Sequence, residues 1–361
     1  MEGYPSDGSC DEYHAGALPK RVLDWSYLML NTQTLAQNLE ALCNDERRHS
    51  EHIEAIILSN NQLTTVPHII SRFTHIKVIN VSNNGMVRLS EAICECPLTT
   101  LIAKNNLLES DSIPKSLANI TSLMELNLSG NNLSVFPEQI LEIPSLKYLF
   151  LGGNRMTEIP QEIWKLHSLQ VLYMGGNQLT EIPASVGELE HLHSLILCDN
   201  MLESLPASVA NLRLLKSLLL HKNQLKTLPP EIIALKGLSE LSLRDNPLVV
   251  RFVRDMTHNP PSMLELAARI IKIHSIPYSS EEVPQNVFEY LNGAHYCLNP
   301  KCKGVFFDNR VEHIKFVDFC GKYRIPLLHY LCSSKCMENV NANSAEECSL
   351  SNDMMKKVLL G

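Results

Sequence analysis

Apolar residues recur along the chain in the pattern L-x-x-L-x-L-x-x-N-x-L, which places one asparagine at a fixed point of each repeat. Six of the eight steps between successive asparagines are 23 residues, a period typical of stacked repeats. The other steps, 22 and 25 residues, flank one asparagine near Cys94, Cys96 and Asp111, where we expect a distorted coil. The nine asparagines are Asn61, Asn84, Asn106, Asn131, Asn154, Asn177, Asn200, Asn223 and Asn246.

Each period predicts a short strand whose leucines point inward, with every coil stacked on the next, as for Leu169, Leu172 and Met174. The asparagine just past the strand is expected to be buried and to bond the backbone of its own and adjacent turns. A second apolar pair ending in proline, such as Ile159-Pro160, is followed by a predicted helical turn on the convex side.

From Ile53 to Leu248 the chain resembles the leucine-rich-repeat family. The resemblance implies an α/β solenoid of horseshoe shape, with nine repeats and a parallel sheet on its concave side. A helical bundle rich in leucine by chance is the alternative. A repeat array needs covered ends, so Leu35, Leu39 and Leu42, at helical spacing, predict one cap and residues 249–252 the other.

Strand residues between the inward leucines are expected to be exposed on the concave face, where one repeat position forms an apolar row. A contiguous apolar patch rimmed by charge usually marks a contact site, so we predict that a target protein binds there. The alternatives are that these side chains pack sideways against each other or that a tail covers them. The predicted contact residues are Tyr148, Phe150, Tyr173, Ile196, Leu219, His221 and Arg244.

Composition and charge narrow the function further. A net charge of -8 disfavours a nucleic-acid partner, and no run of about 18 apolar residues indicates a membrane span. Eleven unevenly spaced cysteines favour a reducing compartment, which we expect to be the cytoplasm, with the nucleus as a second possibility. Cys198 and His221 have no evident third group to orient a base, so the chain is not expected to be an enzyme.

After Pro260-Pro261, the sequence Ser262-Met-Leu-Glu265 is a capping box that predicts a helix to about Ile273. This helix has apolar side chains on more than one side, so it needs two neighbours. Ser262, Met263, Ala267 and Ile271 resemble the Elongin C-binding box of the suppressor-of-cytokine-signalling (SOCS) box, with methionine and alanine in place of its leucine and cysteine.

Downstream, Val283, Pro284, Val287 and Leu291 resemble the cullin-selecting half of such boxes, in the form associated with Cullin-2. The second proline expected for Cullin-5 is replaced by Asn286. The two resemblances together imply contacts with Elongin B/C and with Cullin-2 or Cullin-5. The alternative is that both segments cap the solenoid.

Two cysteine pairs follow, Cys297 with Cys302 and Cys332 with Cys336. Four thiolates around one ion form a closed tetrahedral zinc site, so we predict a structural Zn²⁺ that holds together a region with a small core. Cys320 is the spare candidate ligand, and the surrounding residues 305–330 are expected to form strands. A zinc hydrolase would need an open coordination position and a nearby base, and the sequence indicates neither.

The predicted organisation is a disordered N-terminus (1–16), a cap (17–51), repeats with a second cap (52–258), a SOCS-box-like helical segment (259–293), a zinc knot (294–338) and a disordered tail (339–361). The predicted function is that of an adaptor, a non-catalytic substrate-recognition subunit of an Elongin B/C–cullin ubiquitin ligase that holds a target on the concave face. The competing hypothesis is a signalling scaffold without a ligase, which predicts that Met263, Ala267 and Ile271 are buried against the chain itself.

Overall fold

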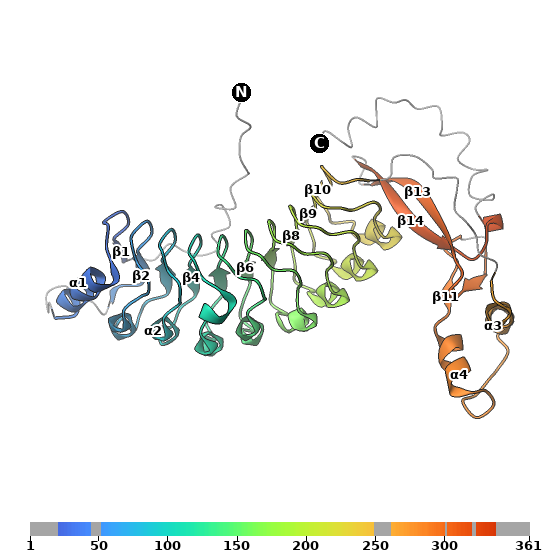
Figure 1. Ribbon diagram of the computed structural model, residues 1–361, viewed down its shortest axis with the longest axis horizontal. Helices are drawn as coiled ribbons and strands as arrows, with labels where there is room; N and C mark the ends of the chain where they lie inside the picture. Colours follow the sequence, from blue (N-terminus) through green and yellow to red (C-terminus); the bar gives the residue numbers. More distant parts are fainter. Residues whose placement is uncertain (1–20, 45–51, 249–260, 300–301, 320–322, 337–361) are drawn as a thin grey trace, which may run out of the picture. The chain divides into compact units, whose positions relative to one another are not determined.

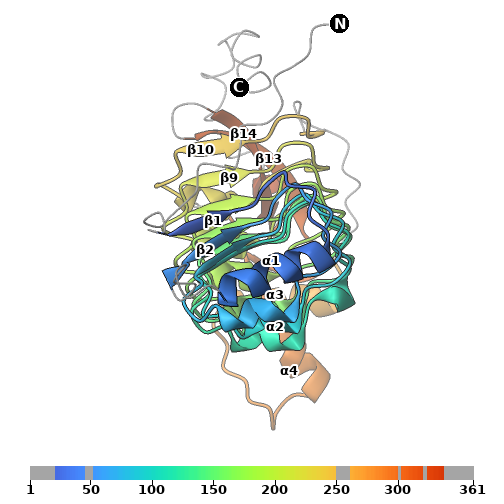
Figure 2. The ribbon, with the colours of Figure 1, turned by 90° about the vertical axis from the view of Figure 1, so that its left-hand side faces the viewer.

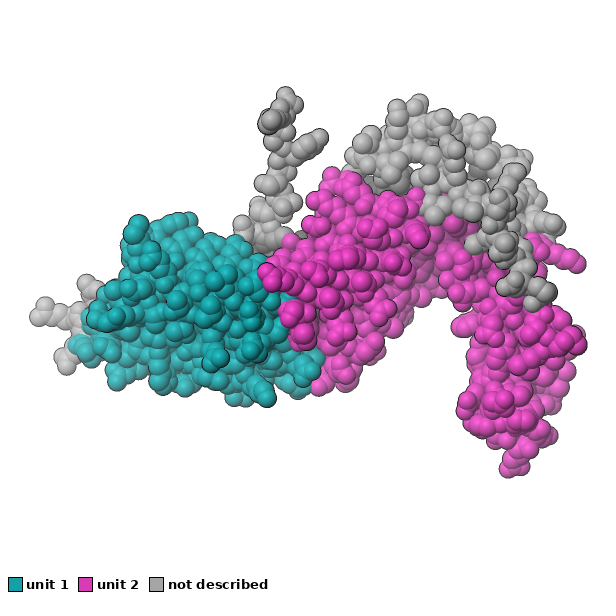
Figure 3. All heavy atoms as spheres, in the orientation of Figure 1, with its two compact units in different colours: residues 1–133, 137–148 teal, residues 134–136, 149–361 magenta. Residues whose placement is uncertain are grey.

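The computed structural model describes residues 21–44, 52–248, 261–299, 302–319 and 323–336. The predicted disordered ends, the second cap at 249–252 and Cys320 lie outside these ranges. The chain divides into two compact units, which are described one at a time (Figure 3). Unit 1 comprises Met1–Leu133 and Pro137–Tyr148, and unit 2 comprises Ser134–Phe136 and Leu149–Gly361.

Short parallel strands, one in each repeat, confirm the predicted α/β leucine-rich-repeat fold. Ten strands, β1 to β10, are hydrogen-bonded in the order in which they follow one another along the chain. They are β1 Val22–Asp24, β2 Ala55–Ile57, β3 Val78–Asn80, β4 Thr100–Ile102, β5 Glu125–Asn127, β6 Tyr148–Phe150, β7 Val171–Tyr173, β8 Ser194–Ile196, β9 Ser217–Leu219 and β10 Glu240–Ser242.

In unit 1, β1 is a strand that the repeat pattern did not predict, because Leu28 stands where the other coils carry their asparagine. It pairs in parallel with β2, Val22 opposite Ala55. Helix α1 (Thr32–Asn44) follows and buries Leu35, Leu39 and Leu42, as predicted for the N-terminal cap. Figure 2 shows β1 and β2 on one side of this unit and the helices α1 and α2 on the other.

The helical segments opposite the strands are mostly single 3₁₀ turns that begin directly after a proline. The predicted distorted coil is present: it contains an α-helix, α2 (Glu91–Cys94), and an additional turn, η4 (Ser110–Ser112). The regular turns are η3 His68–Arg72, η5 Lys115–Asn119, η6 Glu138–Glu142, η7 Gln161–Lys165, η8 Ala184–Glu188, η9 Ala207–Asn211 and η10 Pro230–Ala234.

The repeat asparagine bonds the backbone of two coils, as predicted. The amide nitrogen of Asn200 donates to the carbonyl oxygens of Met174 (3.0 Å), Leu197 (3.1 Å) and Cys198 (3.1 Å), and its oxygen accepts from Leu179 N (3.0 Å). Because these groups are largely shielded from water, the single side chain supplies partners that the backbone would otherwise lack.

In unit 2 the chain continues through α3 (Met263–Ile273) and α4 (Gln285–Asn292) to the antiparallel pair β11 (His295–Tyr296) and β12 (Val305–Phe306). A longer antiparallel hairpin follows, β13 (Val311–Phe319) with β14 (Tyr323–Leu331), in agreement with the strands predicted for 305–330 (Figure 1). Leu228, just before η10, bonds β14 at both its backbone groups: its N–H to Pro326 O (3.0 Å) and its carbonyl to Leu328 N (3.1 Å).

Candidate functional site

Helix α3 exposes its apolar side and buries its polar side. Ser262 caps the helix by accepting a hydrogen bond from Glu265 N (3.1 Å), the position predicted from the capping box. Met263 is 82% exposed and Ile270 55% exposed. We define the apolar α3 face as the exposed residues Met263, Leu264, Leu266, Ala267, Ile270 and Ile273, which span about half of the helix circumference.

The opposite side of α3 packs against the rest of the C-terminal region. Glu265 is 1% exposed and forms an ion pair with Arg269 one turn later. Ala268 is the apolar residue of α3 that is fully buried, in a small cluster with Leu291, Val305 and Phe307. Ile271 is half-buried and packs at the margin of this cluster.

Of the residues that resemble an Elongin C-binding box, Met263 and Ala267 are therefore exposed and Ile271 is partly covered. The scaffold hypothesis predicted that all three are buried against the chain, and the exposure of Met263 and Ala267 contradicts that prediction.

The cullin-selecting segment is only partly accessible. Pro284 is exposed at the N-terminal end of α4, and Val283 and Val287 are half-buried. Leu291 is 1% exposed, so its predicted contact with a cullin is wrong: it is a core residue of the cluster with Val305 and Phe307. Sequence spacing showed that these residues share a helix side but not which protein covers that side.

The four predicted metal ligands, Cys297, Cys302, Cys332 and Cys336, come together, and all their sulfur atoms lie within 4.8 Å of one another. The Sγ of Cys332 is 3.5 Å from that of Cys302 and 3.6 Å from that of Cys336. Sulfur atoms about 2.3 Å from a shared tetrahedral ion lie about 3.8 Å apart, so the cluster matches a four-thiolate metal centre.

Backbone groups around the cluster support bound thiolates. Gly304 N donates to the Sγ of Cys302 (3.2 Å) and Cys332 N donates to the Sγ of Cys297 (3.4 Å), contacts that stabilise negative charge on sulfur. Burial, followed by hydrogen bonds to the neighbouring thiols, raises the pKa of the Cys332 thiol above its ordinary value. A divalent cation reverses this preference because it stabilises the thiolate directly.

Gly304 leaves the room that the cluster needs. A Cβ at this position would lie 2.5 Å from the Sγ of Cys332 and 3.0 Å from that of Cys302. We therefore expect Gly304→Ala to weaken zinc binding by about 10-fold or more, as measured by competition with a chromophoric chelator. Gly293→Ala is the control, because a Cβ there meets Tyr290 O at an ordinary 3.4 Å, and equal affinities for the two variants would contradict the expectation.

The strand face of unit 2 differs from the prediction in its exposure. We use "strand face" for the row Phe150, Tyr173, Ile196 and Leu219 together with the adjoining His221, Lys222 and Arg244. Phe150 and Ile196 are 4% and 5% exposed, so the predicted exposure of the whole row is wrong for these two. Tyr173 and Leu219 are half-buried, as is Tyr148, the last residue of unit 1.

Sideways packing explains the low exposure. The ring centroids of Phe150 and Tyr173 are 6.4 Å apart, and a Cβ on Gly152 would collide with the Tyr173 ring. The tyrosine therefore lies across the glycine of the preceding coil. This is the sideways packing that the sequence left open as an alternative, and it reduces the accessible apolar part of the strand face mainly to Tyr173 and Leu219.

The charged end of the strand face is accessible. Lys222 and Arg244 are exposed and His221 is half-buried. Burial, and then the positive charges of Arg244 and Lys222, lower the pKa of His221, which keeps the imidazole neutral at pH 7. Among the described residues, the buried Nδ1 of His221 and Oγ of Ser194 have no hydrogen-bond partner.

Lys222 has an unusual backbone conformation, with φ of 55°. The residue before the repeat asparagine is left-handed in each regular coil, and elsewhere it is glycine, asparagine or aspartate, which adopt this conformation most readily. A lysine is strained there. The sequence pattern named Lys222 only as a neighbour of the apolar row, and the mismatch between residue and conformation was the signal that could have singled it out.

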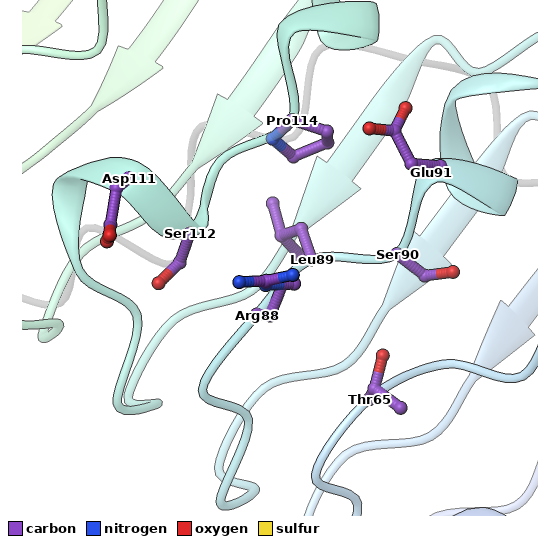
Figure 4. Close-up of a pocket in the computed structure, with 8 residues that line it drawn as sticks. All are labelled: Thr65, Arg88, Leu89, Ser90, Glu91, Asp111, Ser112 and Pro114. Atoms are coloured by element: carbon purple, nitrogen blue, oxygen red, sulfur yellow. The ribbon is translucent and has the colours of Figure 1, made fainter.

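Unit 1 contains a polar hollow of about 430 Å³ at the distorted coil, lined mainly by Thr65, Arg88, Ser90, Glu91, Asp111 and Ser112 (Figure 4). The serines already bond backbone groups: Ser90 Oγ accepts from Ala92 N, and Ser112 Oγ accepts from Glu109 N. The hollow thus follows from how the irregular coil is closed. The sequence predicted the irregularity but not the hollow.

The comparisons with known proteins agree with this fold. A family model described as "Leucine rich repeat" matches residues 121–179. One chain of a solved octameric complex of latrophilin 3, Unc5D and FLRT2, in which FLRT2 is the leucine-rich-repeat protein, is similar with a TM-score of 0.50 at 22% identity. That match covers 64% of this chain and 77% of the other, and it shows the fold alone. Within the described ranges, every helix is too short or too polar to cross a membrane.

Two curated relatives are similar over most of their length. Leucine-rich repeat-containing protein 58 of Homo sapiens is 64% identical over 317 residues, which is 86% of this chain and 85% of that protein. The protein of the same name from Mus musculus is 58% identical over 362 residues, which is 96% of this chain and 99% of that protein. The chain therefore belongs to the leucine-rich repeat-containing protein 58 family.

Proposed function

We propose that this protein is a substrate-recognition adaptor of a ubiquitin ligase: the strand face holds a target protein, and the apolar α3 face binds Elongin C of an Elongin B/C–cullin complex. The chain performs no covalent chemistry in this proposal. It places a lysine of the target beside a ubiquitin-charged enzyme, and proximity supplies the rate. The partners belong to the cytoplasm or nucleus, in agreement with the reducing compartment that the cysteines favour.

The exposure of the apolar α3 face is the observation that carries the proposal. A helix of a soluble protein normally turns its apolar side toward its own core and its charged side toward water. In α3 the charged pair Glu265 and Arg269 is buried, whereas Met263 and Ile270 are more than half exposed. An apolar helix side presented in this way fits the groove of a partner protein, with anchors spaced along one side of the helix.

The cullin contact is proposed for the accessible residues of the downstream segment. Pro284 and, in part, Val283 and Val287 remain available beside α4, whereas Leu291 is excluded by its burial. The absence of a second proline at Asn286 favours Cullin-2 over Cullin-5.

On the target side, we propose that the charged end of the strand face makes the specific contacts. The strained backbone of Lys222 and the unpartnered Nδ1 of His221 both support a role in binding, because strain and unsatisfied buried groups are retained where a ligand compensates for them. Tyr173 and Leu219 supply the apolar part of this surface, and Arg244 extends its charge.

We also propose that zinc is the metal of the cysteine cluster. Four thiolates select a soft or borderline ion, and a closed tetrahedral set leaves no position for a reacting water. The ion would be held by Cys297, Cys302, Cys332 and Cys336 and would supply stability to the C-terminal region.

The ligase proposal is tested by Met263→Asp. Because Met263 is 82% exposed, the substitution should leave the melting temperature of the protein unchanged. It places a charge in the apolar contact, so we expect the affinity for purified Elongin B/C to fall by about 30-fold or more in isothermal titration calorimetry.

Met29→Asp is the matched control, since Met29 is 79% exposed and belongs to unit 1. It should bind Elongin B/C as the wild type does. Absence of binding by the wild-type protein, or equal affinity for Met263→Asp, would remove the ligase proposal and favour a scaffold that uses the strand face alone.

A further inference from the structure

The apolar contribution to the docking of α3 is small. Of its eleven residues, Ala268 is the only apolar one that is fully buried, and Ile271 packs at the margin of the cluster. An isolated helix of this length is marginal in water, so other contacts must hold α3 in place. The larger apolar side chains of α3 are exposed, and without those contacts the helix would gain by turning them toward its own chain.

The polar contacts of α3 are extensive. Glu265 accepts hydrogen bonds from Phe307 N (3.3 Å) and Asn309 N (3.0 Å) and from the guanidinium of Arg269 (Nε to Oε1, 3.1 Å). Arg269 in turn donates to the carbonyl oxygens of Asn309 and Cys332, the second at 2.8 Å. This buried pair fixes which side of the helix faces the protein.

One of these acceptors belongs to the metal cluster. Cys332 is bonded through its N–H to the Sγ of Cys297, and its own Sγ lies beside those of Cys302 and Cys336. The position of the Cys332 carbonyl is therefore set by the four thiols. A metal ion that fixes the thiols also fixes the acceptor to which Arg269 donates.

We propose that the metal cluster and the apolar α3 face form one coupled unit, in which bound metal holds α3 with its apolar side outward through the hydrogen bond from Arg269 to the carbonyl of Cys332. Arg269 is a positioning residue in this unit, because it touches neither the metal nor the partner. The identity of that partner rests on the proposed function, whereas the coupling itself does not.

Coupling is reciprocal, so removal of the anchor must weaken metal binding by the same factor by which metal strengthens helix docking. The test uses the full chain and Arg269→Gln. We expect this variant still to bind one equivalent of zinc, but with an affinity lower by about 10-fold, as measured by competition with a chelator. Amide hydrogen exchange in residues 263–273 should accelerate by a similar factor, while β7 to β9 exchange as in the wild type.

Arg310→Gln is the matched control, because Arg310 lies in the same region and its exposed side chain covers the ring of Tyr330. It should leave zinc affinity and the exchange of 263–273 unchanged. A double substitution, Glu265→Leu with Arg269→Met, guards against misfolding, since it removes the buried charges and fills their volume. It should restore slow exchange of 263–273 while making this exchange insensitive to the removal of zinc.

Unchanged zinc affinity in folded Arg269→Gln, or exchange of 263–273 in the double variant that still responds to zinc removal, would overturn the coupling. The proposed function fails in a different way. If wild-type protein with zinc does not bind Elongin B/C although Arg269→Gln shows the expected losses, the coupling stands and the assigned partner is wrong.

Discussion

Asn200→Ala is expected to lower the free energy of unfolding of the repeats by about 3–5 kcal/mol, because it removes one side chain that bonds four backbone groups. Three of these groups, the carbonyls of Met174, Leu197 and Cys198, lose a donor, and Leu179 N loses its acceptor. An unsatisfied buried group costs about 1–3 kcal/mol, although some of these groups regain a water molecule after truncation.

Urea denaturation followed by circular dichroism measures this loss, and hydrogen exchange shows where it occurs. Since each repeat contacts mainly its neighbours, the acceleration should be concentrated in β7 and β8. Asn211→Ala is the control, because Asn211 lies exposed at the end of η9 and should change the unfolding free energy by less than about 0.5 kcal/mol. Similar losses in both variants would mean that the asparagine ladder is not what holds adjacent coils together.

The same ladder explains why the repeats could be predicted from the sequence. Inward leucines and a buried asparagine impose their constraints within a single coil, so the pattern is complete in each period of 23 residues. Strand β1 escaped prediction because it lacks the asparagine. It is held by pairing with β2, about thirty residues away, as in the register of Val22 with Ala55.

Exposure on the strand face was harder to predict. Alternation along a strand shows on which side a side chain leaves the backbone, but not what its neighbours do. Phe150 is buried because Tyr173 lies across Gly152 in the adjacent coil, and that arrangement depends on the absence of a side chain on a different strand. Local pattern contains no such information.

The orientation of α3 was equally beyond the sequence. Its apolar composition was evident, and so was the need for two neighbours. Which side would face the protein depends on the hydrogen bonds from Arg269 to backbone carbonyls 40 and 63 residues further along the chain, at Asn309 and Cys332. The cysteine cluster, in contrast, could be predicted, because paired thiols within a few residues already resemble a metal site.

Loss of metal should have the largest effect on the C-terminal region. Cys302→Ser, or removal of zinc from the wild type with a strong chelator, is expected to abolish the protection of residues 302–317 and 325–336 against hydrogen exchange. The buried side chains beside the thiols are few: Val311, Leu331 and Cys336 form one small cluster. A structural zinc site contributes about 10–16 kcal/mol in small peptides, far more than such a cluster can replace.

The repeats should withstand the same treatment, because their core is built from many leucines that do not depend on the thiols. Hydrogen exchange should therefore remain slow in β2 to β9 while it becomes fast after residue 302. Cys43→Ser is the matched control, since Cys43 is also half-buried but lies on α1, outside the cluster, and should retain one equivalent of zinc and full protection. If Cys302→Ser keeps its zinc and its protection, the four-thiolate centre is wrong; if the repeats unfold as well, the stability of the array depends on the C-terminal region rather than on its own periodic core.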